Sequence, residues 1–426
     1  MSLEQTLRFN FSMPVWGTRY VDILINMGLP SQLTKGNLLG FPWLSQSLYE
    51  IYTTKLDQKL IVESSVFKLL ERTLETRFVY IDHVMSDNKW RVLRHCNRES
   101  VKSADCRNAA LFSLSPDLIW TENSFTNAAN HIAKGYSAVL CPGLRTTFET
   151  AVPLLRQKYL SNDKRSMGVP VRDLVKICIE NIHPEMKIWF WDSPNYYKFP
   201  TYILFDVPGE GISAFCYILH PVVINAQIRN APFRLIFDQD YLEAACPDVR
   251  KIYIAQDSDE LIFIELSPKN APIPPQPEPQ LPPIQAMTWY GEWQYNRQHR
   301  QFVKNPVRIH YTNLSSKKWK QIEGRGFHII EQIEAGWNIP DRILLESNPK
   351  NLLRRIEARY RFNPEEISTE DRELKEGAQA IIEATTLKTA VIQITALERI
   401  KNTIRRFPKL VRVLKLLRNM LLTHRI

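Results

Sequence analysis

Apolar runs of strand length alternate with helix-like segments through the first 266 residues. Strand-like runs lie at residues 7–17 (with a loop), 47–54, 77–82, 136–141, 211–219, 251–255 and 261–266. Helical periodicity lies at residues 20–33, 61–71 and 122–135. This alternation is typical of a mostly parallel sheet flanked by helices. We therefore expect an α/β fold over residues 1–266.

Within residues 108–121, an apolar run ends in the carboxylate of Asp117, just before a helix start, which places this acid at the carboxyl end of a buried strand. In open α/β sheets, ligands bind in the crevice outside the carboxyl ends of the strands. His220 and Asp257 also close apolar runs. The pattern predicts that Asp117 lies in the main cleft, within short reach of His220 or Asp257.

The segment from Ser267 to Pro283 contains eight prolines and separates this part from the rest of the chain. Prolines at this density favour an extended, semi-rigid spacer, and a PxxP ligand is the alternative interpretation. We expect a first domain at 1–266, a Pro-rich linker at 267–285, an aromatic and basic accessory region at 286–365, and a helical region at 366–426 that ends in a basic amphipathic tail. The part after the linker is expected to be a separate helical module.

Composition and short motifs limit the classes of protein to which this chain can belong. With 426 residues, 44% of them apolar, the chain can bury a large core. Its six cysteines stand singly, without CxxC pairs, which favours buried thiols in a reducing cytoplasm. The sequence has no signal-peptide pattern and no apolar run long enough to cross a bilayer. It also contains neither GxGxxG nor GxxxxGK[ST], which argues against two large nucleotide-binding classes.

Positive charge is concentrated at the end of the chain. Residues 396–426 hold nine Lys or Arg and one Glu, so they carry +8 of the formal net charge of +10. A nucleic-acid enzyme would spread such residues through its cleft, so we do not expect a nucleic-acid substrate. Apolar residues recur in this tail at three- and four-residue steps around Pro408. That pattern suits an anionic membrane surface; packing on the chain's own core, a partner helix or RNA are the alternatives.

Several short motifs occur in a suggestive order. They are Val15-Trp16-Gly17, Ile51-Tyr52-Thr53, Ser115-Pro116-Asp117 with Trp120, Gly143-Leu144-Arg145, His220-Pro221 and Asp257-Ser258-Asp259-Glu260. In this order they resemble bacterial glycosyltransferase-like proteins of the GT-A, or nucleotide-diphospho-sugar transferase, fold. The resemblance implies a GT-A-like sheet over residues 1–266.

The resemblance also implies site residues. The residues that would bind the donor are Trp16, Gly17, Tyr52, Thr53, Asp117, Trp120 and Arg145. The residues that would bind a divalent cation, Mg²⁺ or Mn²⁺, are Asp117 and His220. The family's usual pair of acids is Ser115-Pro116-Asp117 here, with one carboxylate. One carboxylate with phosphate oxygens and waters can hold such a cation. A metal-free enzyme in which Arg145 neutralises the diphosphate is the alternative.

Other residues have two interpretations each. His220 is either a hydrogen-bonded structural residue or a metal ligand. Asp257 and Asp259 either belong to a polar hairpin turn or act as general base in an inverting transfer. Trp16 and Trp120, expected in loops beside the site, either stack on the donor or pack in the core.

The leading functional hypothesis is a cytoplasmic glycosyltransferase, peripheral on the inner face of the membrane. It would move a sugar from a nucleotide-diphosphate donor to a glycan or lipid-linked acceptor. The alternatives are a catalytically degenerate nucleotide- or glycan-binding scaffold of a surface-polysaccharide assembly system, and an unrelated α/β enzyme or RNA-associated protein.

Overall fold

A computed structural model describes residues 7–194, 196, 201–232, 236–272, 282–337, 345, 349–359, 365 and 367–386. The chain divides into two compact units, residues 1–291 with 295–334, and residues 292–294 with 335–426. Each unit is described by itself.

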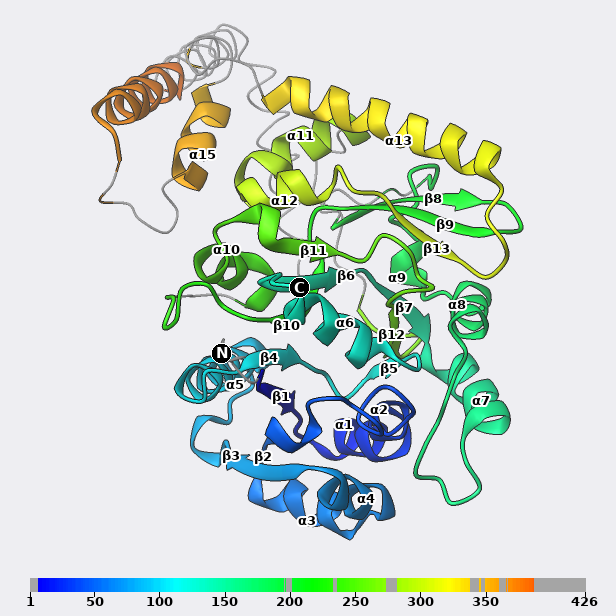
Figure 1. Ribbon diagram of the computed structural model, residues 1–426. Coiled ribbons are helices and arrows are strands. Elements are labelled where there is room, and N and C mark those ends of the chain that lie inside the picture. The colour runs from blue at the N-terminus through cyan, green and yellow to red at the C-terminus, as the bar shows by residue number, and fades with distance from the viewer. Residues whose placement is uncertain are drawn as a thin grey trace, which may run out of the picture. The chain divides into compact units, whose positions relative to one another are not determined.

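The first unit contains a seven-stranded sheet in the order β11-β6-β10-β4-β1-β2-β3 (Figure 1). Its strands are β1 (Phe9–Pro14), β2 (Ser47–Thr53), β3 (Glu75–Tyr80), β4 (Ala110–Ser113), β6 (Ala138–Cys141), β10 (His220–Ile224) and β11 (Ile252–Ile254). All neighbours in this sheet are parallel except β10, which runs antiparallel to β4 and β6. The expected mixed α/β architecture with a mostly parallel sheet is confirmed.

Two three-stranded sheets complete the unit. The first has the order β5-β12-β7, with β5 (Leu118–Trp120), β12 (Phe263–Ser267) and β7 (Gly143–Thr147). The second has the order β13-β9-β8, with β13 (Val307–His310), β9 (Gly211–Cys216) and β8 (Tyr202–Val207), and is antiparallel. The runs 251–255 and 261–266 thus enter different sheets, so the polar hairpin turn, one of the two interpretations of the segment between them, is not formed.

Helices flank the sheets. They are α1 (Thr18–Ile23), α2 (Leu29–Gln32), α3 (Lys55–Glu63), α4 (Ser65–Thr73), α5 (Lys89–Cys106), α6 (Ser124–Ala133), α7 (Phe148–Tyr159), α8 (Val171–Glu180), α9 (Pro184–Lys187), α10 (Leu242–Ala245), α11 (Pro283–Gln294), α12 (Arg297–Phe302) and α13 (Ser316–Trp337). The single helix expected at 61–71 is divided between α3 and α4. The division falls at Ser64, whose hydroxyl accepts the Phe67 N–H at 3.2 Å and caps α4.

The alternation of side chains along β1 determines what covers each face of the sheet. Phe9, Phe11 and Met13 enter an apolar cluster on one face. Asn10 and Ser12 point to the other face, where they meet α5: the Ser12 and Ser100 hydroxyls lie 2.6 Å apart, and Asn10 Nδ2 donates to Ser103 Oγ at 3.1 Å. Polar contacts therefore fix α5 along β1.

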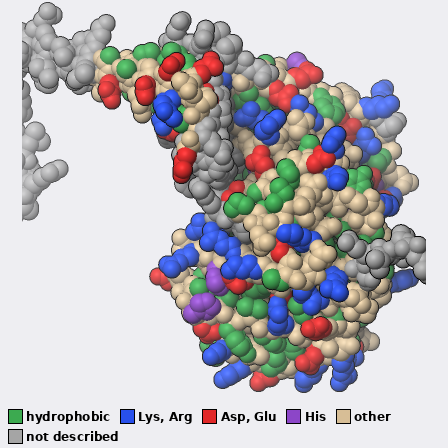
Figure 2. All heavy atoms as spheres, turned by 60° about the vertical axis from the view of Figure 1, so that its left-hand side comes forward, with side chains coloured by type: hydrophobic (Ala, Val, Ile, Leu, Met, Phe, Trp, Pro, Cys, Tyr) green, Lys and Arg blue, Asp and Glu red, His purple; other side chains and the backbone are tan. Residues whose placement is uncertain are grey.

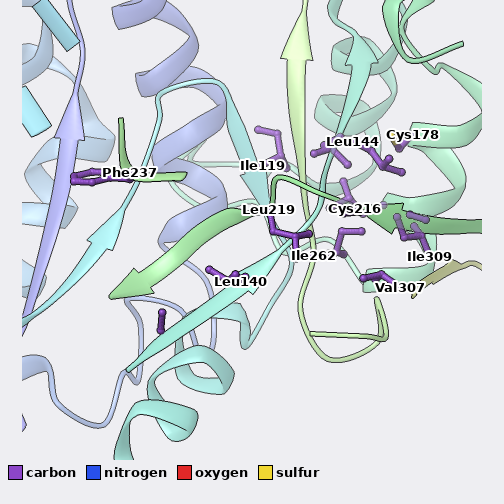
Figure 3. Close-up of a cluster of buried hydrophobic side chains, with 14 of the residues drawn as sticks. Ile119, Leu140, Leu144, Cys178, Cys216, Leu219, Phe237, Ile262, Val307 and Ile309 are labelled. Carbon is purple, nitrogen blue, oxygen red and sulfur yellow. The ribbon is translucent and has the colours of Figure 1, made fainter. Parts of the chain in front are cut away.

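A second apolar cluster joins the smaller sheets to the rest of the unit. Figure 3 shows Ile119, Leu144, Cys216 and Ile262 close to Val307 and Ile309 of β13. Because β13 is hydrogen bonded to β9 and contributes to this core, the accessory region is not the separate helical module expected from the sequence.

The second unit is helical where it is described. It includes α15 (Pro349–Arg359) and a helix at residues 369–386, with Leu352, Ile356 and Ala378 buried together. The expected helical C-terminal region is confirmed to that extent. Residues 273–281 of the expected linker and the whole tail, 396–426, lie outside the described residues. Within the described part of the chain, no helix is both long and apolar enough to span a membrane.

Candidate functional site

A pocket of about 590 Å³ opens where β1 and β4 end. Its wall includes the last residues of both strands, Pro14 and Ser113, and the segments that follow them. The chain runs from β1 outward through β2 to β3 and then returns to place β4 on the other side of β1. Such a reversal of strand order leaves a crevice between the two strand ends, and ligands bind there in open α/β sheets. The volume lies within the range of small-molecule sites.

Asp117 lines this pocket, in the loop between β4 and β5. The Ser115 hydroxyl donates to its Oδ1 at 2.6 Å. Burial and the nearby Glu265 carboxylate raise the pKa of Asp117 to about 6, while Ser115 and Arg145 act in the opposite direction. Asp117 is therefore mostly ionised at neutral pH and takes up a proton in mild acid.

His220 lines the same pocket from the first position of β10. Because β10 runs antiparallel to β4 and β6, its first residue lies at the edge where those strands end. His220 Nε2 lies 3.0 Å from the Ser113 carbonyl oxygen, which can only accept, so Nε2 carries the proton. Burial lowers the pKa of His220, although this hydrogen bond acts against it. A neutral ring with its lone pair on Nδ1 is the form that binds metal ions.

Arg145, on β7, is held between two carboxylates. Its Nε lies 2.8 Å from Glu265 Oε1, and its Nη1 donates a hydrogen bond to the Glu185 carboxylate. Burial lowers the pKa of Arg145, but the two carboxylates outweigh it and raise that pKa overall. The positive charge of Arg145 is thus already compensated within the protein.

Asp238 contributes a further acid to the pocket, from the π-helical turn Phe237–Tyr241. Burial raises its pKa to about 6, and the neighbouring Asp240 adds to the effect. Within the described residues, its carboxylate forms no ion pair. Asp238 therefore has the position and the pKa of a group that could exchange a proton with a ligand.

Aromatic side chains surround the opening. Trp16 follows β1, Tyr20 lies in α1, and Trp90 lies in the first turn of α5; all three line the pocket. Tyr20 and Trp90 are 40% and 52% exposed. Arg19 and Lys89 lie over their rings, 5.7 and 5.1 Å from the centroids, so a stacking ligand would take the opposite face or displace these side chains. Burial and then the Asp117 carboxylate raise the pKa of Tyr20, which places its hydroxyl near that acid.

Of the residues expected to bind donor or metal, the pocket brings together Trp16, Asp117, Arg145 and His220. Gly17, with φ of 81°, donates its N–H to Asp57 Oδ2 at 2.9 Å and does not line the pocket. Tyr52 and Thr53 are buried inside β2. The residues expected from the sequence are thus divided between the pocket and the core.

Trp120 lies within β5 rather than in a loop, and it is fully buried. Its ring packs against Phe125 and Phe263, with centroids 5.2 and 4.9 Å away. It follows an apolar strand-like run, and such a tryptophan fills a core.

Asp257 and Asp259 do not line the pocket either. They lie with His310 in a group whose ligand atoms are within 4.8 Å of one another, a set of three that could hold a metal ion. His310 Nε2 is 2.9 Å from Asp257 Oδ1, and Arg172 pairs with Asp259 at 2.9 Å. No other such set of three is found among the described residues. The proximity of Asp117 to Asp257 expected from the sequence is therefore not supported by a shared pocket.

Sequence reasoning missed Glu265, Asp238, Trp90 and Asn97. Glu265 had a signal, because it is a lone carboxylate inside the apolar run Leu261–Leu266. Asp238 and Asn97 occur among other polar residues. Their place in the pocket depends on tertiary packing, which one sequence does not reveal.

Comparison with known proteins does not identify a family for this chain. No family model and no curated protein sequence matches the chain. Among solved structures, it is similar to a putative glucose-1-phosphate thymidylyltransferase from Bacillus anthracis, determined in complex with sucrose, with 12% identity and a TM-score of 0.22. The match covers 34% of this chain and 57% of that one, less than two thirds of its length. A match of this extent assigns neither a fold nor an activity.

Proposed function

We propose that the protein is a cation-dependent glycosyltransferase that moves a sugar from a nucleotide-diphosphate donor to a glycan or lipid-linked acceptor. The observation that carries the proposal is the pocket between the ends of β1 and β4, whose lining includes an acid, Asp117, and a neutral histidine, His220. The sequence resemblance to GT-A transferases supports the same class.

The charge of the pocket explains why a cation is needed. Its lining carries the acids Asp117, Asp238 and Glu265 against the cations Lys89 and Arg145, and Arg145 is bound to Glu265 and Glu185. A diphosphate entering alone would meet excess negative charge. A divalent cation reverses this local balance. The alternative in which Arg145 alone neutralises the diphosphate is therefore disfavoured.

Asp117 and His220 would hold the cation. Mg²⁺ or Mn²⁺ needs only one or two carboxylates when phosphate oxygens and waters complete its shell, and Asp117 offers such a carboxylate. When bound, the cation neutralises charge that develops on the leaving diphosphate. His220 is kept in place by its hydrogen bond to Ser113 and by the ring of Phe263, 5.0 Å away.

Asp238 is our candidate for the general base. In an inverting transfer, the acceptor oxygen attacks the anomeric carbon, the bond from that carbon to the diphosphate oxygen breaks, and the acceptor proton passes to the base. The pKa of Asp238 is about 6, so its carboxyl group is ionised near neutral pH and can accept the proton in this step. Asp257 and Asp259, the candidates from the sequence, lack a place in the pocket.

The assignment of the base is testable by substitution. Asp238→Asn should abolish transfer and leave binding of the nucleoside diphosphate unchanged, because it removes the proton acceptor and keeps the shape. Asp257→Asn and Asp259→Asn are the matched controls and should retain turnover. Loss of turnover in the controls with normal activity of Asp238→Asn would assign the base to the Asp257 turn instead.

A degenerate, non-catalytic scaffold remains the second candidate. It is favoured by Ser115, which stands where the family has its first acid and serves here as a hydrogen-bond donor to Asp117. A scaffold would bind nucleotide or glycan without consuming a donor.

For the acceptor, we propose a glycan or lipid-linked sugar at the cytoplasmic face of a membrane, reached through the basic segment 396–426. Support for this part comes from the charge and periodicity of that segment alone. This part of the proposal does not depend on the pocket and is tested separately, by deletion of residues 396–426.

Donor turnover tests the proposed activity. A panel of nucleotide sugars should be incubated with the full chain, with Mn²⁺ and with EDTA, and release of nucleoside diphosphate measured. At least one donor should be consumed only with the cation. Binding without consumption of any donor, with acceptor candidates present, would support the scaffold, and absence of binding would exclude both.

A further inference from the structure

Helix α5 extends past the end of β1 and forms one wall of the pocket. Its contacts with β1 define the register: Ser103 meets Asn10, and Ser100 meets Ser12, so the helix and the strand run in opposite directions. One turn nearer the start of the helix, the same register places Asn97 level with the end of the strand. It lines the pocket, as do Leu93, Trp90 and Lys89 further along.

Asn97 combines a largely buried side chain with an amide that faces the pocket. Its side chain is 5% exposed, on the wall of the pocket. Within the described residues, no protein group is hydrogen bonded to its amide. Its amide is not among the fully buried polar atoms that lack a partner, so it keeps some accessible surface on the wall of the pocket, where a ligand can reach it.

Other buried asparagines of the same unit are paired. Asn37 is fully buried, and its Nδ2 donates to the Ser31 and Thr121 carbonyl oxygens at 3.1 and 2.8 Å. Its Oδ1 accepts the Phe125 N–H at 3.0 Å. The open amide of Asn97 is therefore not typical of buried asparagines in this fold.

We propose that Asn97, together with Trp90 and Leu93, forms the subsite that recognises the nucleobase of the donor. An amide presents a donor and an acceptor side by side, which matches the adjacent acceptor and donor on the edge of a base. Trp90 adds a flat ring, 52% exposed, on which a base can stack, and Leu93 adds apolar surface. Asn97 is a specificity-determining residue that takes no part in the chemical step.

This inference rests on the proposed function, because it presupposes a nucleotide donor. The test compares ligands with and without a base. Affinities of UDP, GDP, CDP, ADP, dTDP and inorganic pyrophosphate, each with Mn²⁺, are measured by calorimetry for the wild-type chain and for Asn97→Leu. We expect the preferred nucleoside diphosphate to bind about tenfold more weakly to the variant, the factor that corresponds to about 1.4 kcal/mol, and pyrophosphate to bind equally to both.

Thermal melting separates recognition from a structural role. Because Asn97 has no partner to lose, Asn97→Leu should keep or raise the melting temperature. Asn37→Leu is the matched control and should lower it, since the four hydrogen bonds of the Asn37 amide, to Ser31, Thr34, Thr121 and Phe125, are lost. Trp90→Ala, at an exposed site, should weaken nucleoside diphosphate binding without changing the melting temperature.

Three outcomes would overturn the inference. An equal loss of pyrophosphate affinity would show that Asn97 acts on the diphosphate. An effect confined to nucleotide sugars, with the nucleoside diphosphates unchanged, would assign it to the sugar. A lower melting temperature with unchanged affinities would make it structural. A different result would contradict the proposed function itself: the wild-type chain binds pyrophosphate and every nucleotide equally, or binds none of them. A change seen only in the Asn97→Leu variant concerns the nucleobase subsite alone.

Discussion

At Asp117, burial makes ionisation costly, while the proposed function requires the ionised form. Its pKa of about 6 is above the ordinary value because burial and Glu265 both disfavour the charge. A carboxyl whose pKa is raised by folding stabilises the folded state at low pH, and this contribution is lost as the pH rises through the folded-state pKa. A site that needs a carboxylate must therefore work above about pH 6.

The first prediction concerns this residue. Mn²⁺-dependent nucleotide binding should fall as the pH is lowered through 6, because protonated Asp117 is a poor cation ligand. Asp117→Asn should abolish that binding at pH 7.5 and keep or raise the melting temperature, since it removes a buried charge and keeps the shape. Calorimetry and thermal melting measure the two effects. Undiminished binding by the variant would exclude a metal or diphosphate role.

Trp120 gives a second prediction, because the sequence suggested donor binding and the structure places it in the core. Trp120→Ala should lower the free energy of unfolding by about 3–5 kcal/mol, the usual cost of emptying a buried aromatic site. Denaturant unfolding measures this, with exposed Trp90→Ala as the control expected near zero. A stable Trp120→Ala protein that fails only in nucleotide binding would restore the original interpretation.

Residue-level prediction succeeded where local pattern decides position. Asp117 and His220 were found because each closes an apolar run, and both line the pocket. Asn97 and Asp238 were missed because their positions arise from the register of α5 on β1 and from a turn far along the chain. No local pattern encodes either placement.

At the scale of elements, the strand-like runs predicted most strands of the seven-stranded sheet, while only three helical segments were expected among its helices. The strand β12 lies within the expected run 261–266, whereas β5, β13 and the pocket helix α5 were not expected as elements. The strand expected to end at Asp117 is β4, which ends at Ser113, and an unexpected strand, β5, follows Asp117 in a different sheet. The proline-rich segment suggested a boundary, while β13 pairs back to β9 across it. Long-range pairing of short strands decides both cases.

Strand β13 leads to a third prediction, about truncation. A chain ending at Leu266 lacks β13, so β9 loses its partner and the core loses Val307 and Ile309. It should show no cooperative thermal transition, whereas a chain ending at Trp337 should melt cooperatively. Calorimetry of both chains measures this. A cooperative transition in the shorter chain would restore a self-sufficient domain at residues 1–266.

For the whole molecule, the location of charge matters more than its total. Figure 2 shows acidic and basic side chains interspersed over the face in view, and the sequence before residue 396 carries only +2 of the net +10. The remaining +8 belongs to the segment 396–426. Any electrostatic attraction to a surface should therefore depend on that segment.

The fourth prediction follows from this. Deleting residues 396–426 should abolish binding to vesicles that contain anionic lipid and leave the weak binding to neutral vesicles unchanged, and added salt should weaken binding of the full chain. Vesicle co-sedimentation measures both. If the shortened chain aggregates or loses its cooperative melt, the segment covers the protein's own core, and the membrane proposal is withdrawn.

The central claim is that Asp117 would hold a divalent cation, and with it a nucleotide diphosphate, in the pocket between the ends of β1 and β4. Anomalous diffraction from crystals grown with Mn²⁺ and a nucleoside diphosphate tests it directly, because the manganese signal locates the ion. The account predicts a manganese peak beside Asp117 that is absent in crystals of Asp117→Asn. A peak only at Asp257, Asp259 and His310, with the nucleotide absent from the pocket, would contradict it.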